Sequence, residues 1–221
     1  AALAPTLRPL RNATRALQQR ALFLAAHDKL RLALERETVS RENACLLLPS
    51  GPLSLTVTDD AGERHAFAPG TISYKTTLDL ERLAPILIGA QPAERAHAFL
   101  NDIDVCDLDP ASLGRRVGVL SDRPLILKGS LRRNLTLGLN NRPADNEIMQ
   151  IIDSAGHSQT VTNLGPLSRR LPERGAGLTR EDRIGLSLLR AIIQSPGLIL
   201  ALVPTQDQLD RVFAGRTVLR V

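Results

Sequence analysis

Two stretches of the sequence contain residue types that suit phosphate chemistry. In residues 70–77, a lysine precedes two threonines, Lys75, Thr76 and Thr77. A lysine in front of a helix can reach phosphate oxygens, and a threonine hydroxyl can join the shell of a magnesium ion. Residues 177–210 read as a helix, a tight break and a buried strand. Because a helix N-terminus presents free N–H groups to an anion, this layout is a scaffold for phosphate chemistry.

The groups that would complete this chemistry are missing from both stretches. A phosphate loop needs glycines, because consecutive N–H groups must point at the phosphates from a backbone with positive φ. Residues 70–77 contain one glycine, Gly70, and the lysine–threonine run alone is more typical of an exposed lysine before a helix. The strand of the second stretch ends in Leu202 and Val203, which cannot bind a cation or accept a proton.

Hydrophobic periodicity predicts alternating strands and helices, which indicates an α/β fold. We expect strands at residues 53–57, 65–68, 99–105, 117–120, 198–203 and 217–221, and helices at residues 6–37, 77–88, 111–115, 130–137, 144–155 and 180–194, with loops at 138–143 and 156–177. Asp109 before Pro110, and Thr179 three residues before Asp182, are strong signals for helix starts.

Composition limits the class of protein. A chain of 221 residues can form one large domain, or one domain with a short arm. Aromatic residues make up only 2%, so the core is expected to be aliphatic and no aromatic platform for stacking bases is expected. The net charge is +5, but the arginines are scattered, so we expect solvated helix faces and no nucleic-acid partner.

The metal-ligating residue types are isolated from one another in the sequence. Cys45 and Cys106 are far apart and lack a metal-binding spacing, which argues against zinc and against a disulfide framework. Each of the four histidines is expected to be a surface or hydrogen-bonded residue and not a ligand. No apolar run approaches the roughly 18 residues of a membrane span, and no signal peptide is evident. The first residue is not Met, which suggests a piece of a longer protein.

From residue 102 to 138, the sequence resembles the stretch after the phosphate loop in the ATP-binding cassette of ABC exporters. The resemblance extends over roughly residues 45–221 and depends on collinear blocks, since no single motif is intact. The matching blocks include Asp107-Leu108, Leu113, Arg116-Val117-Gly118-Val119, Gly129-Ser130-Leu131, Asn134-Leu135, Pro172-Glu173-Arg174-Gly175, Leu198-Ile199-Leu200, Pro204-Thr205 and Leu209-Asp210.

This resemblance implies an α/β, P-loop NTPase-like ABC cassette with a mainly parallel core sheet, an antiparallel β subdomain and a helical subdomain. Residues 1–40 resemble a helical connector from a transmembrane domain. Residues 41–221 would form the nucleotide-binding domain, with the helical subdomain at roughly 122–177. The implied cofactors are ATP and Mg²⁺. The implied partners are a second ABC cassette, identical or different, and a transmembrane domain of the same or a partner subunit, at the cytoplasmic face of the cell membrane.

The resemblance also assigns positions in the ATP site. The residues matched to ATP-binding positions are Gly70, Ser73, Lys75, Thr76, Thr77, Asp122 and Thr179, with the Thr76 hydroxyl at Mg²⁺. Tyr74 and Ile72 occupy glycine positions of the phosphate loop. The aspartate and glutamate that order Mg²⁺ and polarise the attacking water correspond to Leu202 and Val203. We therefore expect no catalytic residue in this chain.

The signature that meets the γ-phosphate of an opposite subunit also differs. Thr179 keeps a hydroxyl there, whereas Glu181 and Asp182 place carboxylates where the phosphate would lie, and Arg180 could retain some attraction for it. An ordinary capped helix explains the same residues. Residues 43–50 offer no aromatic side chain for adenine, and the switch histidine would follow Val221.

The expected function is therefore that of a degenerate nucleotide-binding domain of an ABC-type transmembrane exporter subunit. ATP binding would be weak or lost and hydrolysis lost, and the domain would pair with a competent cassette. The alternative is an active ATPase domain whose site is completed by a partner subunit. A scaffold unrelated to transport is a weaker alternative, disfavoured by the helical arm at residues 6–37.

Overall fold

A computed structural model describes residues 46–73, 77–203 and 211–220 of the chain, without the side chain of Ser73. The chain divides into two compact units, Ala1–Asn43 and Ala44–Val221, and every described residue belongs to the second. The helix expected at residues 6–37, and with it the connector expected at residues 1–40, lies outside the described residues. Among those residues, no helix is long and apolar enough to cross a membrane.

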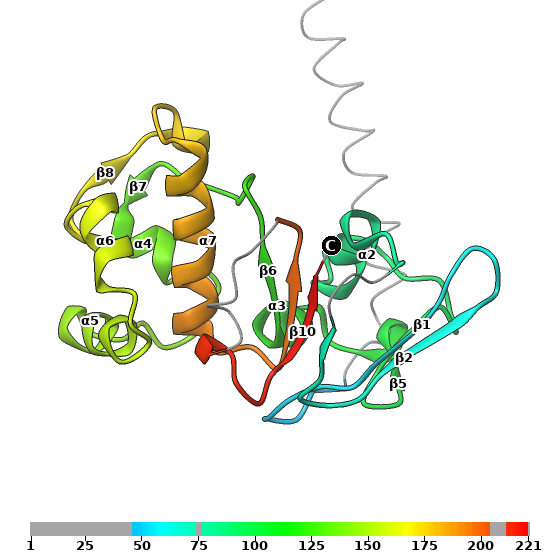
Figure 1. Ribbon diagram of the computed structural model, residues 1–221. Coiled ribbons are helices and arrows are strands. Elements are labelled where there is room, and N and C mark those ends of the chain that lie inside the picture. Colours follow the sequence, from blue (N-terminus) through cyan, green and yellow to red (C-terminus); the bar gives the residue numbers. More distant parts are fainter. Residues whose placement is uncertain (1–45, 74–76, 204–210, 221) are drawn as a thin grey trace, which may run out of the picture. The chain divides into compact units, whose positions relative to one another are not determined.

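A parallel sheet forms the centre of this unit (Figure 1). Its strands follow the order β3 (Ile72–Ser73), β10 (Thr217–Arg220), β9 (Leu198–Ala201) and β6 (Val117–Leu120). All four residues of β9 are buried, as expected for an apolar run between two parallel neighbours. The strand expected at 117–120 is confirmed. The strand expected at 198–203 ends at Ala201, two residues earlier than predicted.

The central strand β9 faces two hydrophobic clusters. Leu198 and Leu200 belong to the cluster shared with the antiparallel sheet and α2 (Leu80–Leu87). Ile199 and Ala201 belong to the cluster shared with the helical part of the unit. Because successive side chains of a strand point to opposite faces, one short strand supplies both cores.

A second, antiparallel sheet has the order β2 (Arg64–Phe67), β1 (Leu55–Thr58), β4 (Ala98–Leu100) and β5 (Ile103–Asp104). The single strand expected at 99–105 is wrong. Asn101 and Asp102 have φ of 49° and 61°, so they form a tight turn between β4 and β5. Asn and Asp tolerate this left-handed conformation better than other non-glycine residues.

Cys106 lies beyond this turn, in a short 3-10 helix at Val105–Asp107, and it is a free cysteine. Its Sγ–H donates to the Ala93 carbonyl at 3.2 Å. Burial, and next the nearby Asp104 carboxylate, raise the pKa of the Cys106 thiol from 9.0 to about 11. We therefore expect alkylation by iodoacetamide at pH 8, measured in a Cys45→Ser background, to be about tenfold or more slower than for an exposed cysteine of ordinary pKa. Asp104→Asn should accelerate it, and a rate equal to that in denaturant would contradict this expectation.

Two helices begin at aspartate caps beside the sheets. In α3 (Pro110–Arg116), Asp109 accepts from the Ser112 N–H at 2.7 Å, which confirms the predicted start. In α2, Asp79 accepts from the Arg82 N–H at 3.1 Å, so the helix begins at Leu80 and not at the predicted Thr77. Pro85 lies inside α2, which continues to Leu87.

The remaining helices form a second part beside the core sheet (Figure 1). They are α4 (Leu131–Leu135), α5 (Asp145–Ser154), α6 (Ser158–Leu164) and α7 (Arg180–Gln194), with a two-stranded ribbon of β7 (Gly129–Ser130) and β8 (Arg170–Leu171). The loop-rich stretch expected at 156–177 is wrong in part, since it contains α6, β8 and a 3-10 turn at Glu173–Gly175. The predicted fold class is confirmed: a mixed α/β unit with a parallel sheet, an antiparallel sheet and a group of helices.

Candidate functional site

Parallel strands of an open α/β sheet end at the same edge, and ligands bind at that edge in such folds. Here β9 is followed by Leu202 and Val203, and β6 is followed by Ser121 and Asp122. Lys75 and Thr76, which follow β3, and the side chain of Ser73 lie outside the described residues. Gly70 lies before β3, where its N–H donates to the Thr217 hydroxyl at 2.9 Å. The structure therefore places Gly70 at the amino end of the strands and Asp122 at the carboxyl end.

The N-terminus of α2 already holds a carboxylate from its own chain. In a phosphate loop, the free N–H groups at a helix start bind phosphate oxygens. In α2 the Asp79 carboxylate accepts a hydrogen bond from the Arg82 N–H. Glu81 adds a second acidic residue near this helix end. Thr77 is exposed and precedes this cap by two residues. Sequence reasoning missed Asp79, although aspartate before an apolar helix is a recognised capping signal.

The end of β9 is apolar and partly enclosed. The Leu202 N–H donates to the Leu120 carbonyl at 2.9 Å, which extends the pairing of β9 with β6. Leu202 lines an open cavity of about 420 Å³ whose walls come from α2, β6 and α7, together with Leu125, Arg190 and Gln194. Val203 is only 2% exposed and belongs to the core on the helical side. Neither side chain can ligate a metal or move a proton.

The start of α7 is capped from within. The Thr179 hydroxyl accepts from the Asp182 N–H at 3.1 Å, and the Asp182 carboxylate accepts from the Thr179 N–H at 3.0 Å. This reciprocal pair is a capping box. It uses the Thr179 hydroxyl, which was predicted to contact phosphate, and it adds a negative charge at the same helix end.

The structure brings Asp122 to the start of α7. Arg180 Nε lies 2.9 Å from Asp122 Oδ2, in an ion pair between residues 58 positions apart in the sequence. The predicted attraction of Arg180 for phosphate is therefore offset by a carboxylate. The two side chains are 62% and 31% exposed, so the pair adds little stability, of order 0–1 kcal/mol.

Two polar residues tie α7 to its surroundings: Ser187, which is buried and which the sequence analysis missed, and Arg190, which is partly buried and belongs to a block that matches the family. The Ser187 hydroxyl donates to the Val119 carbonyl at 2.9 Å and accepts from the Ser121 N–H at 3.1 Å. Arg190 donates to the backbone carbonyl and the side-chain oxygen of Asn134, and burial lowers the pKa of Arg190 to about 10. These contacts join β6, α4 and α7 at the edge of the cavity.

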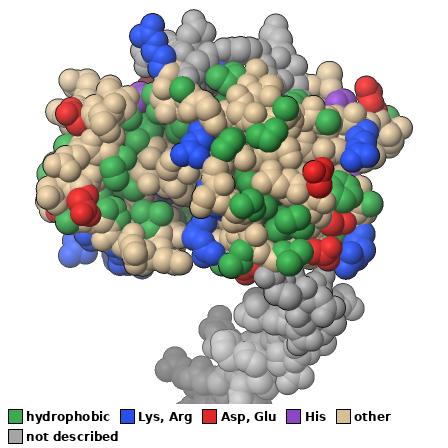
Figure 2. Space-filling view, turned by 90° about the horizontal axis from the view of Figure 1, so that it is seen from below, with side chains coloured by type: hydrophobic (Ala, Val, Ile, Leu, Met, Phe, Trp, Pro, Cys, Tyr) green, Lys and Arg blue, Asp and Glu red, His purple; other side chains and the backbone are tan. Residues whose placement is uncertain are grey.

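Charged side chains of both signs are mixed on the face of the molecule in Figure 2. Figure 2 shows Lys and Arg side chains scattered over one face of the molecule, with acidic and apolar side chains between them. A nucleic-acid interface would require a continuous basic stripe or patch. The face in view offers no such surface.

Comparisons with known proteins agree with this arrangement. No protein-family model matches the chain. A multidrug resistance ABC transporter ATP-binding and permease protein of Lactococcus lactis subsp. cremoris is 28% identical over 116 residues, which cover 47% of this chain and 20% of that protein. A mitochondrial potassium channel ATP-binding subunit of Pongo abelii is 26% identical over 204 residues, covering 83% of this chain and 27% of that protein.

A solved structure also shares the fold. It is a bacterial Atm1-family ABC exporter with ATP bound, which superposes with a TM-score of 0.62 and 16% identity over 80% of this chain and 35% of that chain. Several of the relatives are ABC transporter ATP-binding and permease proteins, and the fold is similar to part of an ABC exporter. The resemblance seen in the sequence is thus confirmed, and the chain is similar to part of the ATP-binding cassette of these transporters. It spans about a third or less of the length of the proteins it matches.

Proposed function

We propose that this chain is a degenerate nucleotide-binding domain of an ABC-type exporter subunit, with ATP binding weak or lost and hydrolysis lost. The observation that carries the proposal is the apolar end of β9. Hydrolysis at this edge requires one carboxylate to order Mg²⁺ and another to polarise the attacking water. Leu202 and the buried Val203 stand there, and neither can take these roles.

The two capped helix starts support weak or lost nucleotide binding. An incoming phosphate at α2 would have to displace the Asp79 carboxylate from the Arg82 N–H. At α7, the capping box occupies the Thr179 hydroxyl and the N–H groups of Thr179 and Asp182. Such caps contribute about 0.5–2 kcal/mol each, and their negative charge also repels an anion that remains nearby.

The proposed partners follow from the relatives, which combine ATP-binding and permease parts. In this proposal, residues 41–221 form the cassette, and residues 1–40 connect it to a transmembrane domain at the cytoplasmic face of the membrane. The cassette pairs with a competent one and contributes packing surface instead of catalytic groups. The apolar framework of the two cores does not depend on nucleotide, so it can be kept after the chemistry is lost.

Nucleotide binding tests the proposal directly. A site of micromolar affinity would stabilise the fold by about 4 kcal/mol at millimolar Mg-ATP. We expect calorimetry and thermal unfolding of the full chain to show no saturable Mg-ATP binding below the millimolar range, and no change on Lys75→Ala. Magnesium tripolyphosphate serves as the control for non-specific phosphate effects.

ATP turnover distinguishes this proposal from an active ATPase. We expect no phosphate release above that of the Lys75→Ala variant, whether the chain is alone or mixed with a competent cassette. Turnover that Lys75→Ala abolishes would overturn the loss of hydrolysis. If such turnover arises only in the mixture, the site is completed by the partner subunit.

A further inference from the structure

The β1–β2 hairpin places three metal-ligating side chains on one face. Its register pairs Val57 with His65, and the Asp59 N–H donates to the Glu63 carbonyl at 2.9 Å just beyond the last paired residues. Side chains alternate along each strand, so positions 57 and 59 share a face with positions 63 and 65. Asp59, Glu63 and His65 therefore gather at the end of the hairpin.

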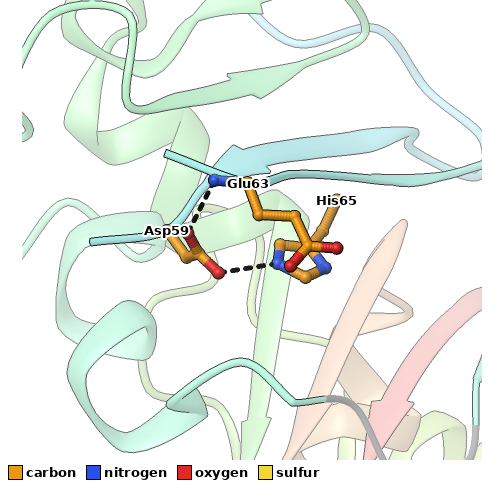
Figure 3. A group of neighbouring side chains, drawn as sticks. All are labelled: Asp59, Glu63 and His65. Atoms are coloured by element: carbon orange, nitrogen blue, oxygen red, sulfur yellow. Dashed lines mark hydrogen bonds and ion pairs between the residues drawn. The ribbon is translucent and has the colours of Figure 1, made fainter. Parts of the chain in front are cut away.

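The potential ligand atoms of these residues are close together. They all lie within 4.8 Å of one another, and no other group of three His, Cys, Asp or Glu residues in the described part of the chain does so. Asp59 Oδ2 lies 3.0 Å from His65 Nε2. Figure 3 shows the Glu63 carboxylate extending toward the His65 ring, beside Asp59. Two donors bound to one tetrahedral zinc ion lie about 3.3 Å apart, so a small side-chain adjustment suffices.

One of the ligands is fixed in place before any ion binds. Asp59 Oδ1 accepts from the Ala61 N–H at 2.9 Å and from the Glu63 N–H at 2.8 Å, which leaves Oδ2 directed at His65. The His65 hydrogen bond, and next the Glu63 N–H, hold the pKa of Asp59 below its usual value, so the group stays a carboxylate. Hydrogen bonds that orient a ligand in this way strengthen metal sites.

We propose that the end of the β1–β2 hairpin binds a divalent transition-metal ion, with Zn²⁺ as the best fit, through Asp59 Oδ2, the Glu63 carboxylate and His65 Nε2. An imidazole beside two carboxylates favours zinc over the magnesium and calcium that all-oxygen sites prefer. Three protein ligands leave a fourth position for water. Binding exchanges the His65–Asp59 hydrogen bond for two metal bonds, and His65 must then carry its proton on Nδ1. The site is independent of nucleotide.

This site could not be predicted from the sequence, because the spacing of its three ligands is set by a hairpin and matches no known motif. The ligands occupy positions i, i+4 and i+6, and only the turn between β1 and β2 brings them together. The expectation that each histidine is isolated holds along the sequence. In the fold, His65 has two carboxylates beside it.

Zinc titration of the full chain tests the proposal. Both cysteines are first replaced by serine, which removes competing thiolates. We expect calorimetry with zinc sulfate at pH 7.5 to give one saturable site per chain, and Co²⁺ to bind the same site with a visible absorption band. His65→Gln keeps an N–H donor for Asp59 but removes the imidazole, and should weaken zinc binding by about tenfold or more. His97→Gln is the matched control and should bind as the parent does.

The proposal is wrong if the parent chain binds no zinc saturably, or if His65→Gln and Asp59→Asn bind it as the parent does, which would indicate an adventitious ion only. If those variants fail to fold, Glu63→Gln decides the question. Glu63 is exposed and its side chain can be changed without touching the core, so unaltered zinc affinity in that variant would also overturn the proposal.

Discussion

Replacing Val203 with glutamate is expected to lower the free energy of unfolding by roughly 3 kcal/mol or more, without producing ATP hydrolysis. Under the proposed function, the substitution supplies a carboxylate that hydrolysis would require at this position, but the surroundings of the side chain are apolar. Val203 is 2% exposed and packs in the same core as Phe213 and Val218. A carboxylate there must either remain charged without solvent or hold a proton.

This penalty should depend on pH. Burial raises the pKa of the introduced carboxyl in the folded state above the value of about 4.3 that it has in the unfolded chain. Well below that value both states are protonated, so the charge contributes no penalty. As pH rises further, the unfolded state ionises first, and stability falls until the folded-state pKa is passed. The variant should therefore be less stable relative to the parent at pH 8 than at pH 5.

Leu202→Glu is the matched control for this experiment. The same residue is introduced one position earlier, where the side chain is partly exposed and lines an open cavity. We expect a loss of less than about 1.5 kcal/mol, within the usual range for a partly exposed site. Urea unfolding at pH 5 and pH 8 measures both variants. Equal losses, or phosphate release by Val203→Glu, would show that this strand end is not the closed apolar core that the structure describes.

Elements with strong local signals could be predicted from the sequence. The strand at Val117–Leu120 and the central strand β9 are short apolar runs, which parallel sheets bury on both faces. The caps at Asp109 and Thr179 depend on contacts within three residues, so the residue types alone indicate them. The family resemblance followed from the order of such blocks along the chain.

Features set by competing or distant contacts could not be predicted in this way. The sequence pattern predicts that this helix begins at Thr77. In the structure the Asp79 carboxylate accepts from an N–H of the first turn, so α2 begins at Leu80. Asn101 and Asp102 divide a continuous β pattern, because a turn there pairs β4 with β5. In the candidate site, the Arg180–Asp122 pair joins the loop after β6 to the start of α7. No local periodicity encodes such a contact.

The second large effect is expected at Asn134, whose side chain is 0% exposed between α4 and the preceding loop. Its Oδ1 accepts from the Leu127 N–H at 2.9 Å, and its Nδ2 donates to the carbonyls of Leu127 at 2.9 Å and Ser130 at 3.1 Å. Arg190 also donates to Oδ1, at 3.3 Å. One amide thus closes the loop before α4 and holds α7 against it.

Asn134→Ala is therefore expected to lower the free energy of unfolding by about 3–4 kcal/mol. The truncation leaves the N–H and C=O of Leu127 without their partner, and each buried unpaired group costs about 1–3 kcal/mol. Arg190 retains only its contact with the backbone carbonyl of residue 134, in a site dry enough to lower its pKa. Urea unfolding measures the loss, and a constant m-value would show that the unfolded state is unchanged.

Two comparison variants separate the amide's hydrogen bonds from its volume. Asn163→Ala removes the same side chain from an exposed position in α6, where it accepts only from Gln159, and should cost less than about 0.5 kcal/mol. Asn134→Asp keeps the acceptor for Leu127 and Arg190 but lacks the Nδ2 donor, so its loss should fall between the two. If Asn134→Ala costs no more than Asn163→Ala, the join between α4 and α7 depends on apolar packing around Leu131 and Leu189, and not on this amide.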